Sequence, residues 1–270
     1  MPLEQSNAIV IRSVEFSESS LILDLYTRDF GKISGIAKGA KRLKNPFESA
    51  LDLLTQISVS FIRKNSEALD LLTEAKLIHR FRPRPGNLMG LNAGYYLAEL
   101  LRLMTEEGDP SPPLYDLATQ TLNRMEEGDH LPEYLFHFEW SLLELSGQRP
   151  STDLCVHCGR EVNMDQERQG KRRISFGFQD GGVICHECRE RSSFQLVATF
   201  DPDAIDWLNR LDPSEPPPFF STESIPVRKE IQGLIHYYFN VLTGKKPRFQ
   251  ETVERGLIPS SLPKKGTSSL

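Results

Sequence analysis

All four cysteines of the chain fall into two Cys-x-x-Cys pairs, Cys155 with Cys158 and Cys185 with Cys188. Each pair can direct two thiolates at one ion, and two pairs supply the four ligands of a tetrahedral metal site. Gly159, directly after the first pair, permits a tight backbone turn there. Four protein ligands leave no open position for water or substrate, so the pattern predicts a structural Zn²⁺ site.

Other uses of the four thiols stay open at this point. Iron accepts four thiolates at the same spacing, and buried thiols need no metal at all. A redox-active Cys-x-x-Cys usually occurs once, after a strand of a βαβ pattern. Two disulfides would require an oxidising compartment, and the first residues, MPLEQ, do not resemble a signal peptide. His157 and His186 lie inside the pairs, where we expect solvated side chains rather than further ligands.

A second candidate site is the glycine-containing stretch of residues 28–44, which carries six cations and one acid, Asp29. The whole chain has a net charge of −5, but residues 1–82 carry +2 and residues 83–270 carry −7. Charge fields are screened within about 8–10 Å, so the local basic stretch matters more than the net charge.

Cations beside aromatic side chains are typical of single-strand binding. The candidate DNA-binding residues are Arg28, Lys32, Lys38, Lys41, Arg42 and Lys44.

The aromatic residues of this region have two interpretations. Phe30 and Phe47 flank the basic stretch, while Phe16, Tyr26 and Phe61 lie elsewhere in the first 82 residues. Taken singly, each is expected in the core, because a small barrel must fill its interior with side chains. The alternative for the basic stretch is a solvated loop. It is not a phosphate-binding P-loop, since the order G-x-x-x-x-G-K-[ST] is missing.

The first 82 residues have the pattern of a small β-barrel. Ile57, Val59 and Phe61 alternate with less apolar residues, and a turn sequence follows at residues 63–66. Five strands with a non-strand segment between the third and fourth are typical of an OB-fold barrel. We expect strands at residues 8–14, 21–27, 32–37, 55–62 and 68–75.

After a break at residues 83–86 (PRPG), the apolar residues recur with helical spacing. The predicted fold class is therefore α+β: an N-terminal OB-fold barrel, then an all-α domain interrupted by a four-cysteine, zinc-ribbon-like insertion. The expected segments are the barrel at 1–82, helical parts at 83–153 and 193–250, the insertion at 154–192 and a flexible tail at 251–270.

Catalytic signatures are missing from the sequence. It contains neither H-E-x-x-H nor G-x-S-x-G, and His79, His130, His137 and His236 share no spacing with acids or cysteines. We therefore expect a protein that is not an enzyme. No run of about 18 apolar residues occurs, so we expect a cytoplasmic protein without membrane contact.

The order of short motifs along the chain resembles the RecO family of bacterial DNA-repair proteins. Each motif is weakly specific alone, but their order and spacing over residues 8–190 make the resemblance strong. The motifs are AIV (8–10), ESS (18–20), GKIS (31–34), AKGAKR (37–42), LTEA (72–75), YYLAEL (95–100), LLELSG (142–147), CVHCG (155–159) and GGVICHEC (181–188).

The resemblance implies an OB fold, a helical domain with a zinc-ribbon-like insert, and no catalytic activity. It implies binding of single- and double-stranded DNA, annealing of complementary strands, and contact with the acidic tail of the single-strand-binding protein. It also implies a complex with RecR that helps to load RecA, with RecF as a further partner, on the bacterial nucleoid. By motif position it assigns DNA binding to Lys38, Lys41 and Arg42, and metal binding to the four cysteines.

One segment departs from the family pattern. Residues 244–249 (GKKPRF) lack the family's basic Ser-Arg motif, so the resemblance assigns no tail-binding role to them. Two other kinds of protein remain as alternatives. One is a zinc-ribbon regulator that binds nucleic acid through the cysteine module, and the other is a scaffold protein without annealing activity.

Overall fold

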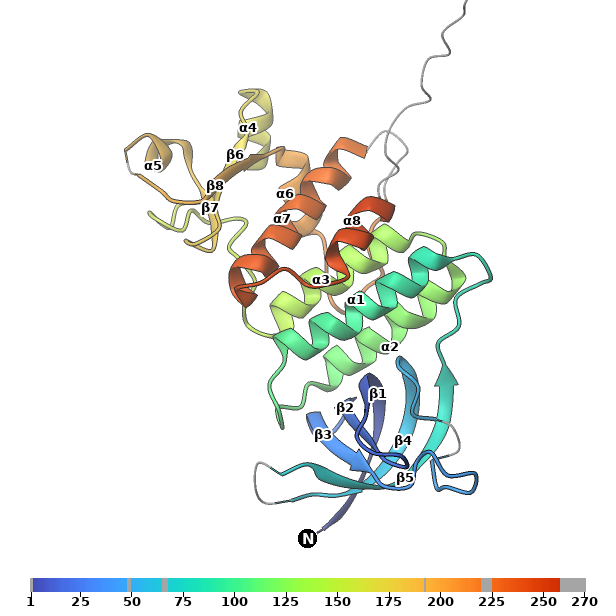
Figure 1. Ribbon diagram of the computed structural model, residues 1–270. Coiled ribbons are helices and arrows are strands. Elements are labelled where there is room, and N and C mark those ends of the chain that lie inside the picture. The colour runs from blue at the N-terminus through green and yellow to red at the C-terminus, as the bar shows by residue number, and fades with distance from the viewer. Residues whose placement is uncertain (1, 48–49, 65–67, 192, 220–224, 258–270) are drawn as a thin grey trace, which may run out of the picture.

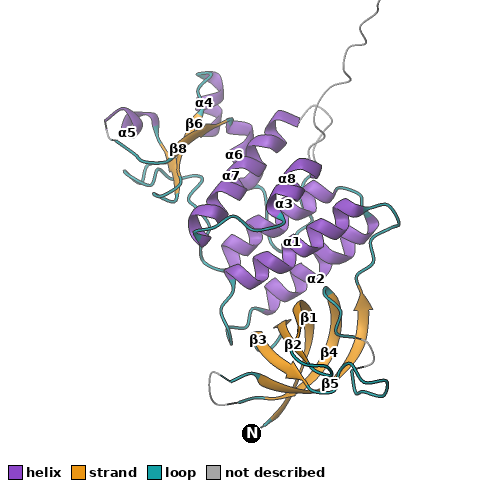
Figure 2. Cartoon of the chain, viewed as in Figure 1, coloured by secondary structure: helices purple, strands orange, loops and turns teal. Residues whose placement is uncertain are grey.

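The computed structural model describes residues 2–47, 50–64, 68–191, 193–219 and 225–257. A barrel of N-terminal strands lies against one end of a helical bundle, and a small part with its own strands projects from the other end (Figure 1). Strands and helices are thus segregated along the chain, as Figure 2 shows by colour. No helix in the described ranges is long and apolar enough to cross a bilayer.

The N-terminal strands form a closed five-stranded barrel in the order β1-β2-β3-β5-β4. β3 and β5 pair in parallel, and the other neighbours are antiparallel. β2 and β4 have the predicted bounds, whereas β1 and β5 are longer because their ends pair with the ends of β4. The strands are β1 (Leu3–Glu15), β2 (Leu21–Thr27), β3 (Gly31–Ala37), β4 (Thr55–Ile62) and β5 (Asp70–Arg80).

The barrel has two apolar faces with different partners. Its interior is filled by alternating residues such as Leu23, Val59 and Phe61, which are fully buried. On the outside, Ile9, Ile11 and Tyr26 belong to the core of the helical domain. The barrel is therefore docked on the helices through its own outer surface.

The helical domain packs around one continuous core. Trp140 and Phe138 are fully buried at its centre, and α2 ends at Gly128, whose positive φ of 83° suits a glycine C-cap. The helices are α1 (Leu88–Met104), α2 (Pro112–Glu127), α3 (Leu131–Leu145), α6 (Pro202–Asn209), α7 (Ile225–Thr243) and α8 (Gln250–Leu257).

The cysteine-containing insertion is larger than predicted. Its three-stranded sheet has the order β7-β6-β8, and β8 lies beyond the expected boundary at residue 192. Phe176 packs edge-on against Tyr238 of α7, with ring centroids 6.1 Å apart, so the insertion shares the helical core. Its elements are α4 (Met164–Gln169), β6 (Ile174–Gly177), β7 (Gly182–Ile184), α5 (His186–Arg191) and β8 (Val197–Phe200).

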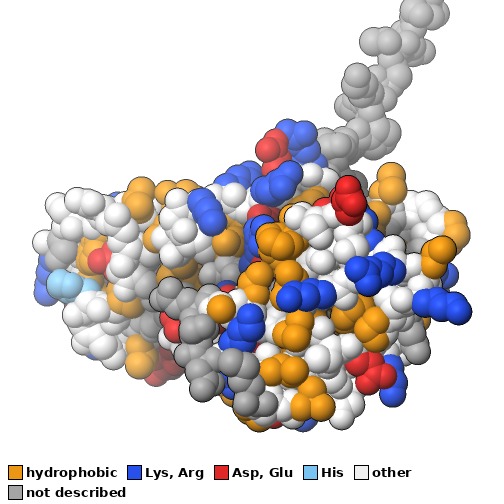
Figure 3. Space-filling model, turned by 60° about the horizontal axis from the view of Figure 1, so that its bottom comes forward, with side chains coloured by type: hydrophobic (Ala, Val, Ile, Leu, Met, Phe, Trp, Pro, Cys, Tyr) orange, Lys and Arg blue, Asp and Glu red, His pale blue; other side chains and the backbone are white. Residues whose placement is uncertain are grey.

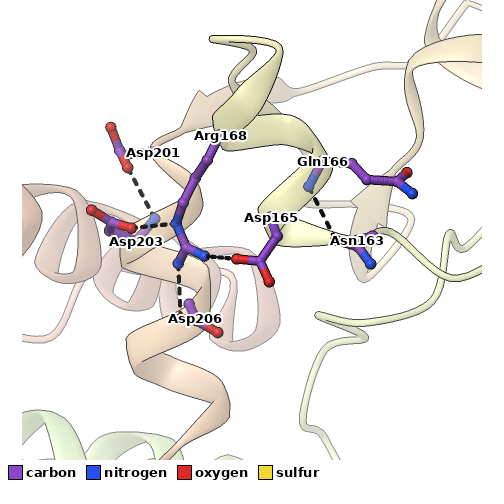
Figure 4. A network of polar contacts seen from close by, with 7 residues as sticks. All are labelled: Asn163, Asp165, Gln166, Arg168, Asp201, Asp203 and Asp206. Atoms are coloured by element: carbon purple, nitrogen blue, oxygen red, sulfur yellow. Dashed lines mark hydrogen bonds and ion pairs between the residues drawn. The ribbon is translucent and has the colours of Figure 1, made fainter.

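Arg168 of α4 ties the insertion to α6 (Figure 4). Its guanidinium donates to Asp203 at 2.6 Å, to Asp206 at 2.8 Å and to Asp165 of its own helix at 2.6 Å. The Asp206 and Asp203 carboxylates hold the pKa of Arg168 above its ordinary value. Three carboxylates around one guanidinium fix the position of α4 relative to α6.

The predicted tail at 251–270 begins too early. Residues up to 257 form α8, in which Val253 is fully buried; residues 258–270 lie outside the described part of the chain. Glu254 accepts a hydrogen bond from His236 Nδ1 at 3.1 Å and from Lys246 Nζ at 3.1 Å. The hydrogen bond from His236 lowers the pKa of Glu254 to about 2. Long-range pairing, which local composition does not reveal, therefore holds this helix in place.

His236 is also the centre of a buried polar cluster. Its Nε2 lies 2.9 Å from Oε1 of Glu139, a close ion pair rather than an aligned hydrogen bond, and Tyr96 donates to the same oxygen at 2.7 Å. Burial, the largest single effect, would lower the pKa of His236, but the charges and hydrogen bonds of Glu139 and Glu254 together outweigh it and raise the pKa to about 9. The cluster joins α1, α3, α7 and α8, and sequence spacing gave no sign of it.

Candidate metal centre and nucleic-acid interface

The four cysteines converge on one point. Their Sγ atoms all lie within 4.8 Å of one another, and those of Cys158 and Cys185 are 3.8 Å apart. Metal–sulfur bonds of about 2.3 Å place the sulfurs of a tetrahedron about 3.8 Å apart, whereas a disulfide requires about 2.05 Å. All four cysteines are free thiols. The donor set and its spacing therefore fit one four-coordinate metal ion.

Two local backbone turns aim the thiols. Gly159 has a positive φ of 71°, and its N–H donates to the Cys155 carbonyl at 2.8 Å, closing the first turn. Cys185 follows β7 and Cys188 lies in α5, so the second pair spans a strand-to-helix turn. The Cys185 N–H donates to Cys155 Sγ at 3.3 Å and links the two turns. The site is thus built mostly from short-range structure around each pair.

The four thiols differ in their electrostatics. Arg160 donates to Cys158 Sγ at 3.4 Å, and this hydrogen bond lowers the pKa of the Cys158 thiol to about 6. Burial raises the pKa of the Cys188 thiol to about 12. A bound cation would supply the charge that a buried thiolate needs.

The basic residues after β3 are held on a structured loop. Phe47 is buried in the barrel core, while Asn45 accepts from the Phe47 N–H at 2.8 Å and donates to the Arg42 carbonyl at 2.7 Å. Pro46 accepts from the Ala75 N–H of β5 at 3.2 Å. These contacts and the packing of Ala40 against the barrel core fix the loop's inner side, while its charged side chains are exposed. We call residues 38–44 the basic loop.

Four of the six predicted cations lie on the basic loop. Lys38, Arg42 and Lys44 are exposed and make no ion pair with any residue that the structure describes. Lys41 is exposed but lies 2.9 Å from the Glu15 carboxylate, and its N–H donates to the Ser19 carbonyl at 3.1 Å. The loop is therefore a cluster of cations whose charge is largely available to an anion.

Arg28 and Lys32 do not belong to that cluster. Arg28 donates through Nε and a terminal nitrogen to both oxygens of Asp116 in α2, each at 3.0 Å. Lys32 Nζ donates to the Arg102 carbonyl at 3.0 Å and to the Thr105 carbonyl, where α1 ends. Burial lowers the pKa of Lys32. These two cations join the barrel to the helices, and the structure does not bring them together with the four cations of the basic loop.

Gly31 lies at the same junction between the barrel and the helices. Its φ is +66°, and a Cβ at this position would lie 2.1 Å from the Asp109 carbonyl oxygen. Only glycine allows the barrel and the α1–α2 connection to approach this closely.

The aromatic side chains divide between core and surface. Tyr26, Phe47 and Phe61 are buried, and Phe30 packs edge-on against Phe61 at 5.4 Å. The expectation that each belongs to the core holds for these four. Phe16 is the exception, with 62% of its surface exposed at the end of β1.

The barrel end of the molecule displays both cations and apolar groups. In Figure 3, Lys and Arg side chains lie scattered among exposed hydrophobic ones over the face that this view brings forward, with few acidic groups between them. Leu43 of the basic loop and Phe16 are among the exposed large hydrophobic residues of the barrel. This combination of cations and apolar surface suits a polyanion with apolar faces, such as single-stranded nucleic acid.

Two family models cover most of the chain. Residues 1–81 match the one described as Recombination protein O N terminal, and residues 87–248 match Recombination protein O C terminal. The chain belongs to the RecO family. The boundary between the two matched regions coincides with the junction between barrel and helices.

Three relatives named DNA repair protein RecO match between 72% and 93% of this chain. A protein of Rhodopirellula baltica named DNA repair protein RecO is 39% identical over 266 residues, 90% of this chain and 96% of that protein. A protein of the same name from Bacillus pumilus is 28% identical over 258 residues, 93% of this chain and 95% of that one. One from Listeria monocytogenes serotype 4b is 32% identical over 195 residues, 72% of each. These matches confirm the resemblance seen in the motifs.

Sequence reasoning about this RecO-family chain missed two features of the barrel surface. Phe16 was assigned to the core, although its neighbours Ser17, Glu18 and Ser19 mark an exposed loop that could have signalled exposure. Arg63 was treated only as part of a turn, yet its guanidinium lies 5.6 Å from the Phe30 ring centroid and lines a hollow of about 320 Å³ beside β3. No local pattern would have found the second feature.

Proposed function

We propose that this RecO-family protein is a recombination mediator that binds DNA through the exposed cations of its barrel. The observation that carries the proposal is the basic loop, where Lys38, Arg42 and Lys44 face solvent while the other cations of the stretch are used inside the molecule. The strand order and the parallel β3–β5 pair support an OB-fold, whose strand faces and loops bind oligonucleotides in other proteins.

Annealing follows from charge neutralisation. Two complementary strands repel each other, and cations that displace condensed counterions lower that repulsion. Base pairing then selects the partner strand, so the protein needs no base-specific contacts. The net charge of −7 on residues 83–270 would keep DNA on the barrel and leave the helices for protein partners. We propose RecR, the acidic tail of the single-strand-binding protein, RecA and RecF as those partners, in the bacterial cytoplasm.

We propose that the four-cysteine centre holds a structural Zn²⁺ ion. Cys155, Cys158, Cys185 and Cys188 would hold it, and the ion would fix the insertion without taking part in a reaction. The closed thiolate set supports this role, because it leaves no position for a substrate. We further propose that the protein has no catalytic activity of its own.

The test replaces Lys38, Arg42 and Lys44 together with alanine. Binding of a fluorescent single-stranded oligonucleotide is measured by anisotropy at several salt concentrations. Because each neutralised phosphate contributes about 0.7 to the log–log salt slope, the slope should shrink by roughly 2. Annealing of complementary strands should slow in parallel. An unchanged slope and unchanged annealing would refute the assignment of DNA binding to this loop.

A further inference from the structure

The outer face of the barrel carries a row of apolar side chains that do not contribute to the barrel interior. Val14, Ile22 and Ile36 are register neighbours on β1, β2 and β3, and Leu71 continues the row on β5. The residues that follow Ile22 and Ile36, Leu23 and Ala37, are fully buried inside the barrel. Side chains alternate between the faces of a strand, so the row points outward.

This row is partly open to solvent. Val14 is 40% exposed, and Ile22, Ile36 and Leu71 are intermediate. Adjacent exposed apolar residues on a small domain mark a surface that contacts something else. The helices do not cover this part of the barrel, since their core takes Ile9, Ile11 and Tyr26 instead.

Phe16 extends the apolar surface beyond β1. Its N–H donates to the Ser20 carbonyl at 3.1 Å, which holds the backbone of the β1–β2 loop in place while the ring stays 62% exposed. The Lys41 N–H donates to Ser19 in this same loop. The β1–β2 loop and the basic loop therefore form one surface.

Cations border the apolar row on this surface. Lys38 directly follows β3, two residues after Ile36, and is exposed. Arg42 and Lys44 continue along the basic loop, and Leu43 between them is fully exposed. Apolar groups beside cations complement a ligand that combines planar bases with a chain of phosphates.

We propose that Phe16 and the apolar row of Val14, Ile22 and Ile36 form a platform for the unpaired bases of single-stranded DNA. The cations of the basic loop hold the phosphates of the same strand. Unpaired bases expose their π faces, whereas in a duplex these faces are stacked inside the helix. The platform therefore gives the protein a preference for single strands that the cations alone do not provide. This inference rests on the proposed function.

The test compares Phe16→Ala with the unchanged protein on three probes of equal length. The probes are a single-stranded oligonucleotide, an abasic strand with the same phosphates, and a duplex. Stacking of one base on an aromatic ring corresponds to a change of about 5- to 100-fold in affinity. Phe16→Ala should weaken binding of the base-bearing strand by that factor. The abasic strand and the duplex should change by less than about twofold, and the salt slope should stay the same because no charge is lost.

Two more variants sharpen the test. Phe16→Trp should keep the affinity, and its fluorescence should be quenched more by the single strand than by the duplex, because native Trp140 and Trp207 are buried. Leu88→Ala removes a side chain that is 71% exposed at the start of α1, and it should change nothing.

The failures of the two proposals are distinguishable. If Phe16→Ala binds the base-bearing strand as the unchanged protein does, while the basic-loop variant is weakened, the platform is refuted and the proposed function stands. Equal losses on all three probes would also refute the platform, since they indicate a general disturbance of the surface. If neither variant changes binding, both proposals fail.

Discussion

The basic loop and the cysteine insertion are both rich in charged residues, but they use their charges differently. In the insertion, Arg160 pairs with Glu187 at 2.6 Å, Arg172 with Glu167 at 2.7 Å and Arg173 with Glu230 at 2.8 Å. On the basic loop, Lys38 and its neighbours have solvent on their outer side. These three arginines of the insertion are engaged in ion pairs within it and with α7, whereas most cations of the basic loop are available to a ligand.

The difference shows why a basic sequence is not by itself a binding site. Each cation attracts a polyanion only to the extent that no carboxylate or carbonyl of the protein has already neutralised or desolvated it. Arg28 and Lys32 lie in the basic stretch of the sequence, but in the structure their side chains hydrogen-bond to the helical domain.

The largest expected effect comes from breaking the metal centre. Cys155→Ser with Cys158→Ser removes two of four thiolates, and metal content measured by mass spectrometry should fall from about one ion to none. The insertion should lose protection in hydrogen exchange, because an ion bound in the native state stabilises that state. Affinity for single-stranded DNA should stay within about twofold.

Leu154→Ala is the matched control, because this side chain is 47% exposed and adjoins Cys155 without being a ligand. It should keep the metal. Loss of DNA binding by the double cysteine variant, with the barrel still folded, would return the binding role to the insertion.

A pair of lysine variants separates the two kinds of cation. Lys32→Met removes hydrogen bonds to the Arg102 and Thr105 carbonyls at the end of α1, and should destabilise the protein by about 1–3 kcal/mol without changing the salt slope of DNA binding. Lys38→Met removes an exposed charge, and should reduce the slope by about 0.7 with little effect on stability. Chemical denaturation and salt titrations measure both. If the two variants change the stability and the salt slope by the same amounts, the distinction between the two kinds of cation is refuted.

The smallest expected effect concerns the one paired cation of the basic loop. Glu15→Gln removes the carboxylate 2.9 Å from Lys41 and makes that ammonium available to phosphate. The salt slope should rise by up to about 0.7, and affinity at low salt should increase a few-fold. Glu4→Gln on the far part of β1 serves as the control of equal charge. If both variants raise the affinity equally, net charge rather than the local pair is responsible.

The sequence determined those parts of the protein that depend on short separations. Alternation along the strands gave β2 and β4 their bounds, because side chains on a strand change face at every residue. The two cysteine pairs were recognisable because the two cysteines of each pair are three positions apart in the sequence. In both cases the interacting residues are neighbours in the chain, so local geometry decides the outcome.

Only the tertiary structure decided which charges are available and which segments are fixed. Arg28 meets Asp116 across 88 residues of sequence, and Lys32 meets Thr105 across 73. Glu254 meets His236 and thereby makes α8 a packed helix where a tail was expected. The sequence sets the charge of each side chain, but the partner that neutralises it comes from packing between elements far apart in the chain. Burial of Tyr26 likewise depends on how the barrel docks on the helices, since this side chain belongs to the core of the helical domain.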